Sequence, residues 1–242
     1  MIVGYCFFDY NPCMPRPLRN AKGDVVYHVL NRGNGRARIF RTARDYEAFE
    51  EILVAAQERA AMRITAYCIM PNHWHLVLWP RKDGDLSEFM RWLTVTHTQR
   101  WHAAHGTAGS GHVYQGRFKS FPVQSDEHYL TVCRYVERNA LQASLVRRAQ
   151  QWRWSSLWHR LAKESGMKSH LTSGPLPFPE PWDRLVNQKL TEKEVEGLRK
   201  CLKRSSPFGH KPWITRIANT LGLTSTLRPR GRPRKTNAKK GS

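Results

Sequence analysis

The sequence predicts an α+β protein in which helices pack on a mainly antiparallel sheet, followed by a small helical extension and a basic tail at the C-terminus. Strand and helix signals follow one another in the order β-α-β-β-α-β-α, which is typical of this class. Hydrophobic residues make up 40% of the chain, enough for a packed core. The length of 242 residues favours one full domain with a smaller module, since domains typically run to roughly 100–200 residues.

The first half of the chain alternates between strand and helix signals. β-branched and aromatic runs indicate strands, and apolar residues at helical spacing indicate helices. On these signals we expect a strand over 25–30, a helix over 43–61, strands over 63–69 and 73–79, and a helix over 85–103. The turn-prone segment 31–35 ends the first strand, and Met70-Pro71-Asn72 separates the two middle strands.

The second half is expected to be mostly helical. A fourth strand is predicted over about 113–123, and a helix from Ser125, its N-cap, to about residue 145. The capping-box spacing of Thr191 and Glu194 predicts a helix that runs to about residue 204. A further short helix is expected over 213–221, ended by Gly222. The last two helices loosely match a helix-turn-helix.

Composition shifts divide the chain into five segments. They are an irregular basic arm (1–22), the main domain (23–162), a Pro-rich linker (163–182), a helical accessory region (183–224) and a basic tail (225–242). The linker has proline at four alternate positions, which indicates a semi-rigid segment. Because Met14 begins a second basic leader, no function is assigned to residues 1–13.

The composition also indicates the partner and the compartment. The chain has 40 Lys and Arg against 19 Asp and Glu, a formal net charge of +21, so we expect nucleic acid as the partner. We expect no membrane partner, because the sequence has no evident long amphipathic helix with a basic face. No run of 18 apolar residues is present, and the opening segment lacks the basic start of a signal sequence. We therefore expect a cytoplasmic, nucleoid-associated protein whose five scattered cysteines are reduced thiols.

Two histidines on one predicted strand are candidate metal ligands. Residues two apart in a strand point to the same face, so His73 and His75 project together while Trp74 points to the other side. Two convergent imidazoles can bind a divalent metal. The alternative is that one or both are structural or surface histidines.

Tyr135 is the candidate nucleophile. On the helix that begins near residue 125, Tyr129 belongs to the apolar core stripe, whereas Tyr135 lies about 120° away from it on a helical wheel. Asn139 follows one turn later, so its side-chain oxygen is expected to face the same place. A divalent cation held by His73, His75 and Asn139 would polarise a phosphodiester, and Tyr135 would attack its phosphorus.

Together these motifs resemble those of the single-tyrosine HUH transposases, and more narrowly the REP-associated tyrosine transposases. The resemblance covers about residues 24–160, and the quoted motifs are Pro71-Asn72-His73-Trp74-His75-Leu76-Val77, Gly116-Arg117-Phe118-Lys119-Ser120 and Arg134-Tyr135-Val136-Glu137-Arg138-Asn139. Ala140 stands where relatives often have proline.

The resemblance implies an HUH endonuclease-like sandwich and a metal-dependent DNA strand transferase. It implies a catalytic tyrosine at Tyr135, a metal site at His73, His75 and Asn139 that takes Mg²⁺ or Mn²⁺, a 5′-phosphotyrosine link, and single-stranded hairpin DNA from repetitive palindromes as substrate. Relatives act as homodimers or as monomers, and both stay open here. Two alternatives also stay open: a hairpin-binding or regulatory protein without catalysis, and a metallonuclease that uses water.

Basic residues in four places are candidate DNA contacts. They are Arg32 and Arg36 in a Gly-rich turn, Arg117 and Lys119 on one strand face, Arg134 and Arg138 beside Tyr135, and Arg230, Arg232 and Arg234 in the tail. The tail resembles an AT-hook, because proline keeps its backbone extended and guanidinium groups suit a narrow A·T minor groove. The alternative is a disordered tail that contacts phosphates without specificity.

Overall fold

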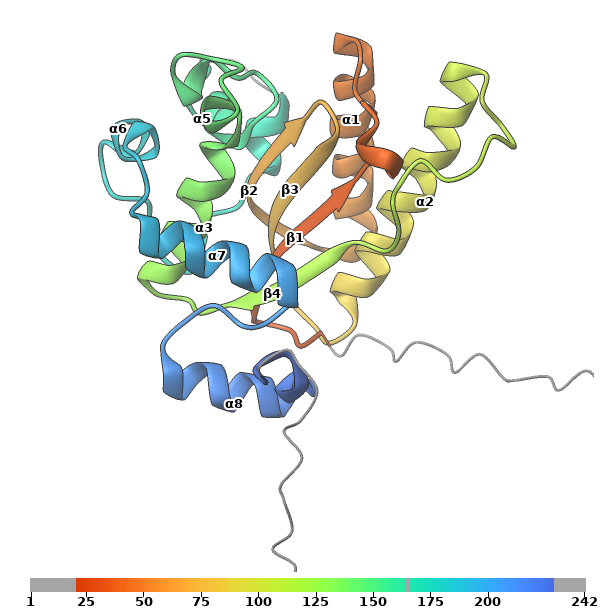
Figure 1. Cartoon of the computed structure of the whole chain (residues 1–242). Helices are drawn as coiled ribbons and strands as arrows, with labels where there is room; N and C mark the ends of the chain where they lie inside the picture. The colour runs from red at the N-terminus through yellow and green to blue at the C-terminus, as the bar shows by residue number, and fades with distance from the viewer. Residues whose placement is uncertain (1–20, 164–165, 229–242) are drawn as a thin grey trace, which may run out of the picture.

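The computed structural model describes residues 21–163 and 166–228 (Figure 1). Its centre is a four-stranded sheet in the order β2-β3-β1-β4, in which every neighbouring pair of strands is antiparallel. The strands are β1 (Val26–Arg32), β2 (Arg63–Met70), β3 (His73–Trp79) and β4 (Lys119–Val123). The predicted fold class and the β-α-β-β-α-β-α order are confirmed.

One face of the sheet is covered by α1 (Ala43–Ala60) and α2 (Asp85–His105), which lie side by side (Figure 1). The strand residues that face these helices are large and apolar, and Trp74, Leu76 and Val29 are fully buried among them. A helix-period stripe on α1 packs on this face because its apolar side chains recur every three or four residues. This layer holds the larger of the two hydrophobic cores.

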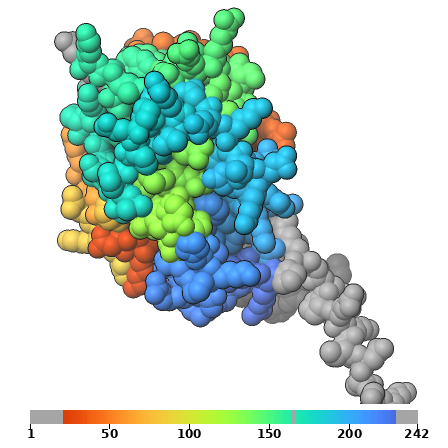
Figure 2. Space-filling model, turned by 90° about the vertical axis from the view of Figure 1, so that its left-hand side faces the viewer, coloured from red at the N-terminus to blue at the C-terminus, as the bar shows by residue number. Residues whose placement is uncertain are grey.

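The opposite face is covered by helices from the second half of the chain. They are α3 (Glu127–Glu137), α4 (Asn139–Gln142), α5 (Ser156–Leu161), α6 (Trp182–Asn187) and α7 (Glu192–Arg204). Val26, Val77 and Val123 point to this face and pack with the apolar stripe of α3 in a second core. Figure 2 views the molecule from the side of α6. On this side, residues from the C-terminal part of the chain (cyan to blue) lie next to residues from its middle (green).

Two predicted boundaries were wrong. β4 begins at Lys119, not near residue 113, because residues 113–118 pass the end of β1 and join it through a single bridge between Gly33 and Tyr114. The predicted helix over 125–145 is two helices, since α3 ends at Glu137 and α4 begins at Asn139. Its N-cap is Asp126 and not Ser125, because the Asp126 carboxylate accepts the backbone N–H of His128 at 2.9 Å.

The C-terminal region follows the predicted pattern. α7 begins after the capping box formed by Thr191 and Glu194, as expected. α8 (Lys211–Leu221) begins two residues earlier than predicted and ends at Gly222, whose φ of 68° is the left-handed conformation that glycine adopts most readily. The backbone N–H of Gln124 donates to the carbonyl of Phe208, which joins the segment between α7 and α8 to the end of β4.

The Pro-rich segment lies against the main domain. Leu171 forms an isolated bridge with Ile64 of β2, and Leu176 and Phe178 pack against the second core. Residues 1–20 and 229–242 lie outside the described residues, and with them most of the predicted basic arm, Cys6, Cys13 and the tail residues Arg230, Arg232 and Arg234. In the described ranges, Cys68, Cys133 and Cys201 are buried free thiols, and none of the helices is long and apolar enough to cross a membrane.

A buried hydrogen-bond chain under the sheet makes stability sensitive to acid. The Trp74 indole donates to the Tyr114 hydroxyl at 3.0 Å, and that hydroxyl shares a second hydrogen bond of 2.7 Å with Nδ1 of His97. Burial lowers the pKa of His97 to about 3, so the folded protein keeps this imidazole neutral. The unfolded chain binds a proton there near pH 6.5, and acid therefore favours unfolding.

We expect the free energy of unfolding to fall as the pH decreases from 7 to 5, with a share of about 2 kcal/mol from His97. The His97→Gln variant is expected to lose that share of the pH dependence. Urea denaturation at both pH values measures it, with exposed His112→Gln as the control. Equal pH dependence in wild type and His97→Gln would contradict the assignment.

Candidate active site

The predicted histidine pair lies on the face of the sheet that α3 covers. In the register of β1 and β3, Arg32 pairs with His73 and Leu30 pairs with His75, so these four side chains share one face. The two imidazole centroids are 5.1 Å apart. The same-face projection that the sequence predicts for His73 and His75 is present, with Trp74 fully buried on the other side.

A third histidine, His28 of β1, completes the cluster and was missed from the sequence. Its Nε2 lies 2.9 Å from Nδ1 of His75 in a buried hydrogen bond. Burial lowers the pKa of His28 to about 3 and holds the pKa of His75 well below its usual value. Burial and the nearby Arg32 lower the pKa of His73 to about 4. All three imidazoles are therefore neutral at pH 7, the form that binds metals.

Tyr135 lies beside this cluster. Its ring is edge-on to His75 with centroids 5.7 Å apart, and 6.4 Å from the ring of His28. The side chain is half-buried, unlike Tyr129, which is fully buried in the core as predicted. Burial raises the pKa of Tyr135, while Arg199 of α7 and Arg32 of β1 act in the opposite direction. The phenol is therefore protonated at pH 7 and lies where two guanidinium groups favour its ionised form.

Asn139 lies at the break between α3 and α4. Its Nδ2 donates to the carbonyl of Tyr135 at 2.8 Å, which satisfies an acceptor that the interrupted helix leaves free. No hydrogen bond within residues 21–163 and 166–228 engages its Oδ1, or joins it to His73 or His75. The structure thus places Asn139 one turn from Tyr135 with an oxygen available.

The donor atoms of the histidine pair fit a metal site. Nδ1 of His73 lies 2.6 Å from Oδ1 of Asn72, and Nδ1 of His75 is shared with His28. When each Nδ1–H donates in these bonds, each Nε2 keeps a free lone pair, the usual arrangement of metal-binding histidines with an outer partner. That tautomer puts the remaining proton of His28 on its Nδ1, which is buried without a partner. His73 and His75 could hold a divalent cation, and the part of Asn139 Oδ1 as a further ligand stays a prediction.

A second group of potential metal ligands lies elsewhere on the described surface. It consists of Asp126, Glu127, His128 and His210, whose ligand atoms all lie within 4.8 Å of one another. His210 Nε2 is 3.0 Å from Glu127, so the group ties the start of α8 to the start of α3. His128 precedes Tyr135 by two helical turns, about 10 Å along the axis. This group is therefore separate from the histidine pair that contacts Tyr135.

Two of the predicted DNA contacts serve a structural role as well. The guanidinium of Arg134 donates to the carbonyl of Leu185 at 3.2 Å, and that of Arg138 donates to the carbonyls of Val186 and Asn187. These carbonyls lie in the last turn of α6, where that of Leu185 also accepts the backbone N–H of Gln188, so the two arginines help to cap the helix. A contact with phosphate by either arginine stays a prediction.

The remaining described candidates differ in position. Arg36 is exposed in the short 3-10 turn after β1. Arg32, Arg117 and Lys119 line one groove near Tyr135, together with Arg199 and Lys203 of α7. The two α7 residues were missed because nothing in the local sequence indicates which part of the sheet α7 covers.

The chain is similar to known transposases. The sequence profile of the family described as "Transposase IS200 like" matches residues 21–139. That range holds the whole sheet, the histidine cluster, Tyr135 and Asn139.

Two solved structures are also similar to the chain. One is a REP-associated tyrosine transposase bound to a REP hairpin; it is 17% identical, has a TM-score of 0.49, and the alignment covers 73% of this chain and 98% of that chain. The other is a transposase-like protein from Deinococcus radiodurans, 15% identical with a TM-score of 0.37, where 57% of this chain and 96% of that chain are covered. No curated protein matches the sequence.

Proposed function

We propose that the chain belongs to the IS200-like transposases, whose profile matches residues 21–139, and that it nicks and rejoins single-stranded DNA at palindromic hairpins through a 5′-phosphotyrosine on Tyr135. Within the family we assign it to the REP-associated tyrosine transposases, on the motifs around His73, Gly116 and Tyr135. The observation that carries the proposal is the half-buried Tyr135 ring, edge-on to His75 of the histidine pair.

In the proposed reaction, the Tyr135 oxygen forms a bond to phosphorus and the bond from phosphorus to the 3′ oxygen of the DNA breaks. The phenol loses a proton, and the released 3′ oxygen takes one up. Because the phosphodiester linkage is exchanged rather than hydrolysed, the reverse attack by a 3′ hydroxyl rejoins the strand without ATP.

The chain's own groups prepare this step. Arg32 and Arg199 favour the ionised phenol against the effect of burial. His28 fixes the orientation of the His75 ring through their shared hydrogen bond. Asn139 holds the carbonyl of Tyr135 at the break in the helix and so positions the nucleophile. A divalent cation, Mg²⁺ or Mn²⁺, bound by His73, His75 and Asn139 would polarise the phosphodiester and offset its charge.

The partner in this proposal is DNA. A net charge of +21 favours a polyanion, and the groove beside Tyr135 is lined by cations. We assign the basic tail the role of an AT-hook-like element that adds affinity, with hairpin preference left to the folded domain. The proposed site of action is the DNA of the nucleoid in the cytoplasm, and the protein acts there as a monomer or a homodimer.

The test is covalent capture of DNA by the purified full chain. A single-stranded hairpin oligonucleotide labelled at its 3′ end is incubated with Mn²⁺, and the products are separated on a denaturing gel. The label marks the fragment that keeps the 5′ phosphate, so a labelled band at the mass of the protein plus that fragment is the expected result. Mass spectrometry of the digested adduct is expected to find the nucleotide on the peptide that contains Tyr135.

Three outcomes separate the alternatives. An adduct that forms with Mn²⁺ and is lost with EDTA supports the proposed chemistry. Hairpin binding on a native gel without an adduct, across several hairpins and metals, would favour a non-catalytic binding protein. Free fragments that end in a 5′ phosphate, without an adduct, would indicate a metallonuclease that uses water.

A further inference from the structure

The C-terminal half of α7 forms one wall of a cationic groove. The groove has a volume of about 410 Å³ and runs between α7 and the adjoining ends of β1 and β4. Its charged lining residues are Arg32, Arg117, Lys119, Arg199 and Lys203, and no acidic residue in the described part of the chain lines it. Three of the five come from the sheet side and two from α7, so neither part alone forms the site.

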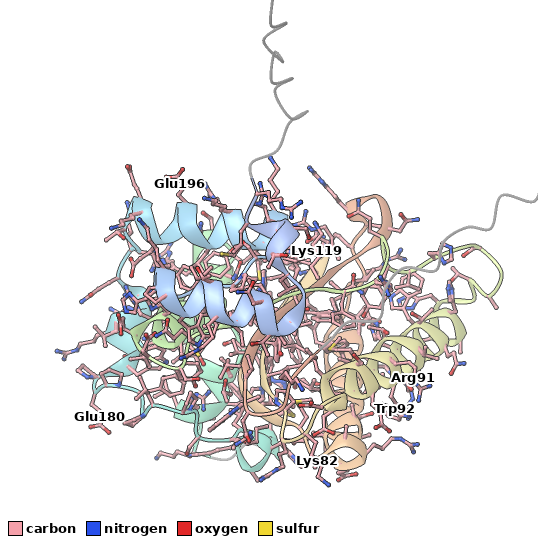
Figure 3. All side chains as sticks on the ribbon, turned by 90° about the horizontal axis from the view of Figure 1, so that it is seen from below. Lys82, Arg91, Trp92, Lys119, Glu180 and Glu196 are labelled. Atoms are coloured by element: carbon pink, nitrogen blue, oxygen red, sulfur yellow. The ribbon has the colours of Figure 1, made fainter. Side chains whose placement is uncertain are left out.

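The charges on α7 are separated along its length. Its acidic residues all precede Leu198, with Lys193 as the one basic residue among them, and the other four basic residues follow Leu198. Leu198 and Cys201 are buried against the second core, which turns Arg199 and Lys203, one turn apart, to the groove. Figure 1 shows α7 lying across the sheet, and Figure 3 places Lys119 beside its C-terminal end and Glu196 toward its other end.

No residue in the described ranges neutralises the cations of this groove. Among the described residues, the side chains of Arg117, Lys119, Arg199 and Lys203 make no ion pair and no hydrogen bond. The Nε atom of Arg32 is buried without a partner. A buried guanidinium N–H without an acceptor is costly, and four further cations gathered beside it repel one another. An anion in the groove would supply the acceptor and the counter-charge that these groups lack.

The lining indicates which part of a nucleic acid binds there. None of the groove residues is aromatic, so the groove offers no platform for stacking bases. Arginine presents a planar fork of donors that matches phosphate oxygens, and lysine provides a point charge. The groove therefore suits a sugar-phosphate backbone rather than bases. Arg32 pairs with His73 in the register of β1 and β3, and the His75 ring is edge-on to Tyr135, so this end of the groove lies on the same face of the sheet as the nucleophile. The charges of Arg32 and Arg199 also favour the ionised form of Tyr135.

We propose that Arg199 and Lys203 of α7, with Arg32, Arg117 and Lys119, bind the phosphodiester backbone of the single strand that leads to Tyr135, and that Arg199 binds the phosphate nearest the phenol. This inference rests on the proposed function, because the bound strand is the substrate of that reaction. It assigns the accessory region a direct part in the active site. α7 forms a wall of the groove and adds two positive charges to the three that residues 21–139 supply.

The test compares two losses of one positive charge on the same helix. Arg199→Gln removes a groove residue, and Lys200→Gln removes an exposed residue outside the groove. Both variants are made in a Tyr135→Phe background, so that binding of a labelled hairpin with a single-stranded flank is measured without chemistry. We expect Arg199→Gln to reduce the slope of log K against log salt by about 0.7, the share of one phosphate contact on a single strand. Lys200→Gln is expected to leave the slope unchanged.

Neutral phosphates locate the contact. A methylphosphonate is placed at each position of the flank in turn, and binding is measured with both variants. We expect one phosphate position at which the methylphosphonate weakens DNA binding by the Tyr135→Phe protein but not by the Tyr135→Phe protein that also carries Arg199→Gln. The methylphosphonate and Arg199→Gln would then each remove the same contact. For Lys203→Gln the affected position is expected to be a neighbouring phosphate.

The outcomes separate this inference from the proposed function. Equal salt slopes for Arg199→Gln and Lys200→Gln, with no coupling at any phosphate, would overturn the groove even where the wild type forms the adduct. A reduced slope and a coupled phosphate would support the groove even where no adduct forms. Equal coupling of Arg199 to a single-stranded RNA of the same sequence would overturn the assignment of the groove to the DNA substrate.

Discussion

The Tyr135→Phe variant is expected to form no covalent adduct while it binds hairpin DNA as the wild type does. The change removes the oxygen that would bond to phosphorus and keeps the ring that contacts His75 and His28. Loss of the nucleophile is expected to reduce adduct formation by on the order of 10³-fold or more. The dissociation constant for the hairpin is expected to change by less than about twofold, because the phenol is one polar group among many phosphate contacts.

A matched control lies on the same helix. Tyr129 precedes Tyr135 on α3 and is fully buried in the second core, so its hydroxyl faces no DNA. Tyr129→Phe is expected to keep the adduct, measured on the same denaturing gel. Adduct formation by Tyr135→Phe at the wild-type rate would assign the nucleophile to another residue. Loss of the adduct in both variants would point to a disturbed α3 rather than to a missing oxygen.

The features that the sequence predicts correctly depend on local periodicity. The alternation of β3 places His73 and His75 on one face whatever the strand pairs with. The helical period of α3 separates Tyr129 in the core from the half-buried Tyr135 in the same way. Both follow from backbone geometry within a single element, so neither requires knowledge of the tertiary fold.

The features that the sequence does not predict depend on which elements meet. His28 becomes part of the site only because β1 pairs with β3, and strand order is not contained in the alternation of β1. Arg199 acts on the pKa of Tyr135 only because α7 packs on β4. The break in the helix after Glu137 cannot be predicted from the sequence either, because the apolar stripe continues through Ala140. At the break, the Asn139 side chain donates a hydrogen bond to the carbonyl of Tyr135.

Glu137 is the clearest example of a residue whose role depends on the fold. A charged residue on a helix is normally expected at the surface, yet its side chain is fully buried. One carboxylate oxygen accepts a hydrogen bond from Ser156 of α5, and the other accepts from the indole of Trp182 at 2.6 Å. Arg160 of α5 lies 3.5 Å away as its counter-charge. Glu137 therefore joins the C-terminal end of α3 to both α5 and α6.

The Glu137→Ala variant is expected to lose about 3–5 kcal/mol of unfolding free energy, because it leaves Arg160 without its counter-charge and the Trp182 indole without its acceptor. Urea denaturation followed by tryptophan fluorescence measures this loss, and the melting temperature is expected to fall by about 10 °C. Glu51→Ala, an exposed position on α1, is the control and is expected to change the free energy by less than about 0.5 kcal/mol. Equal stability of the two variants would contradict the role of Glu137.

The same variant also connects stability with catalysis. Glu137 follows Tyr135 by two residues, so its buried bonds fix the turn of helix from which the phenol projects. At a temperature where Glu137→Ala remains folded by circular dichroism, adduct formation per folded molecule is expected to decrease as well. Glu137→Gln keeps an acceptor for the Trp182 indole and is expected to recover part of both losses. If adduct formation per folded molecule stays at the wild-type level, Glu137 stabilises the fold without positioning Tyr135.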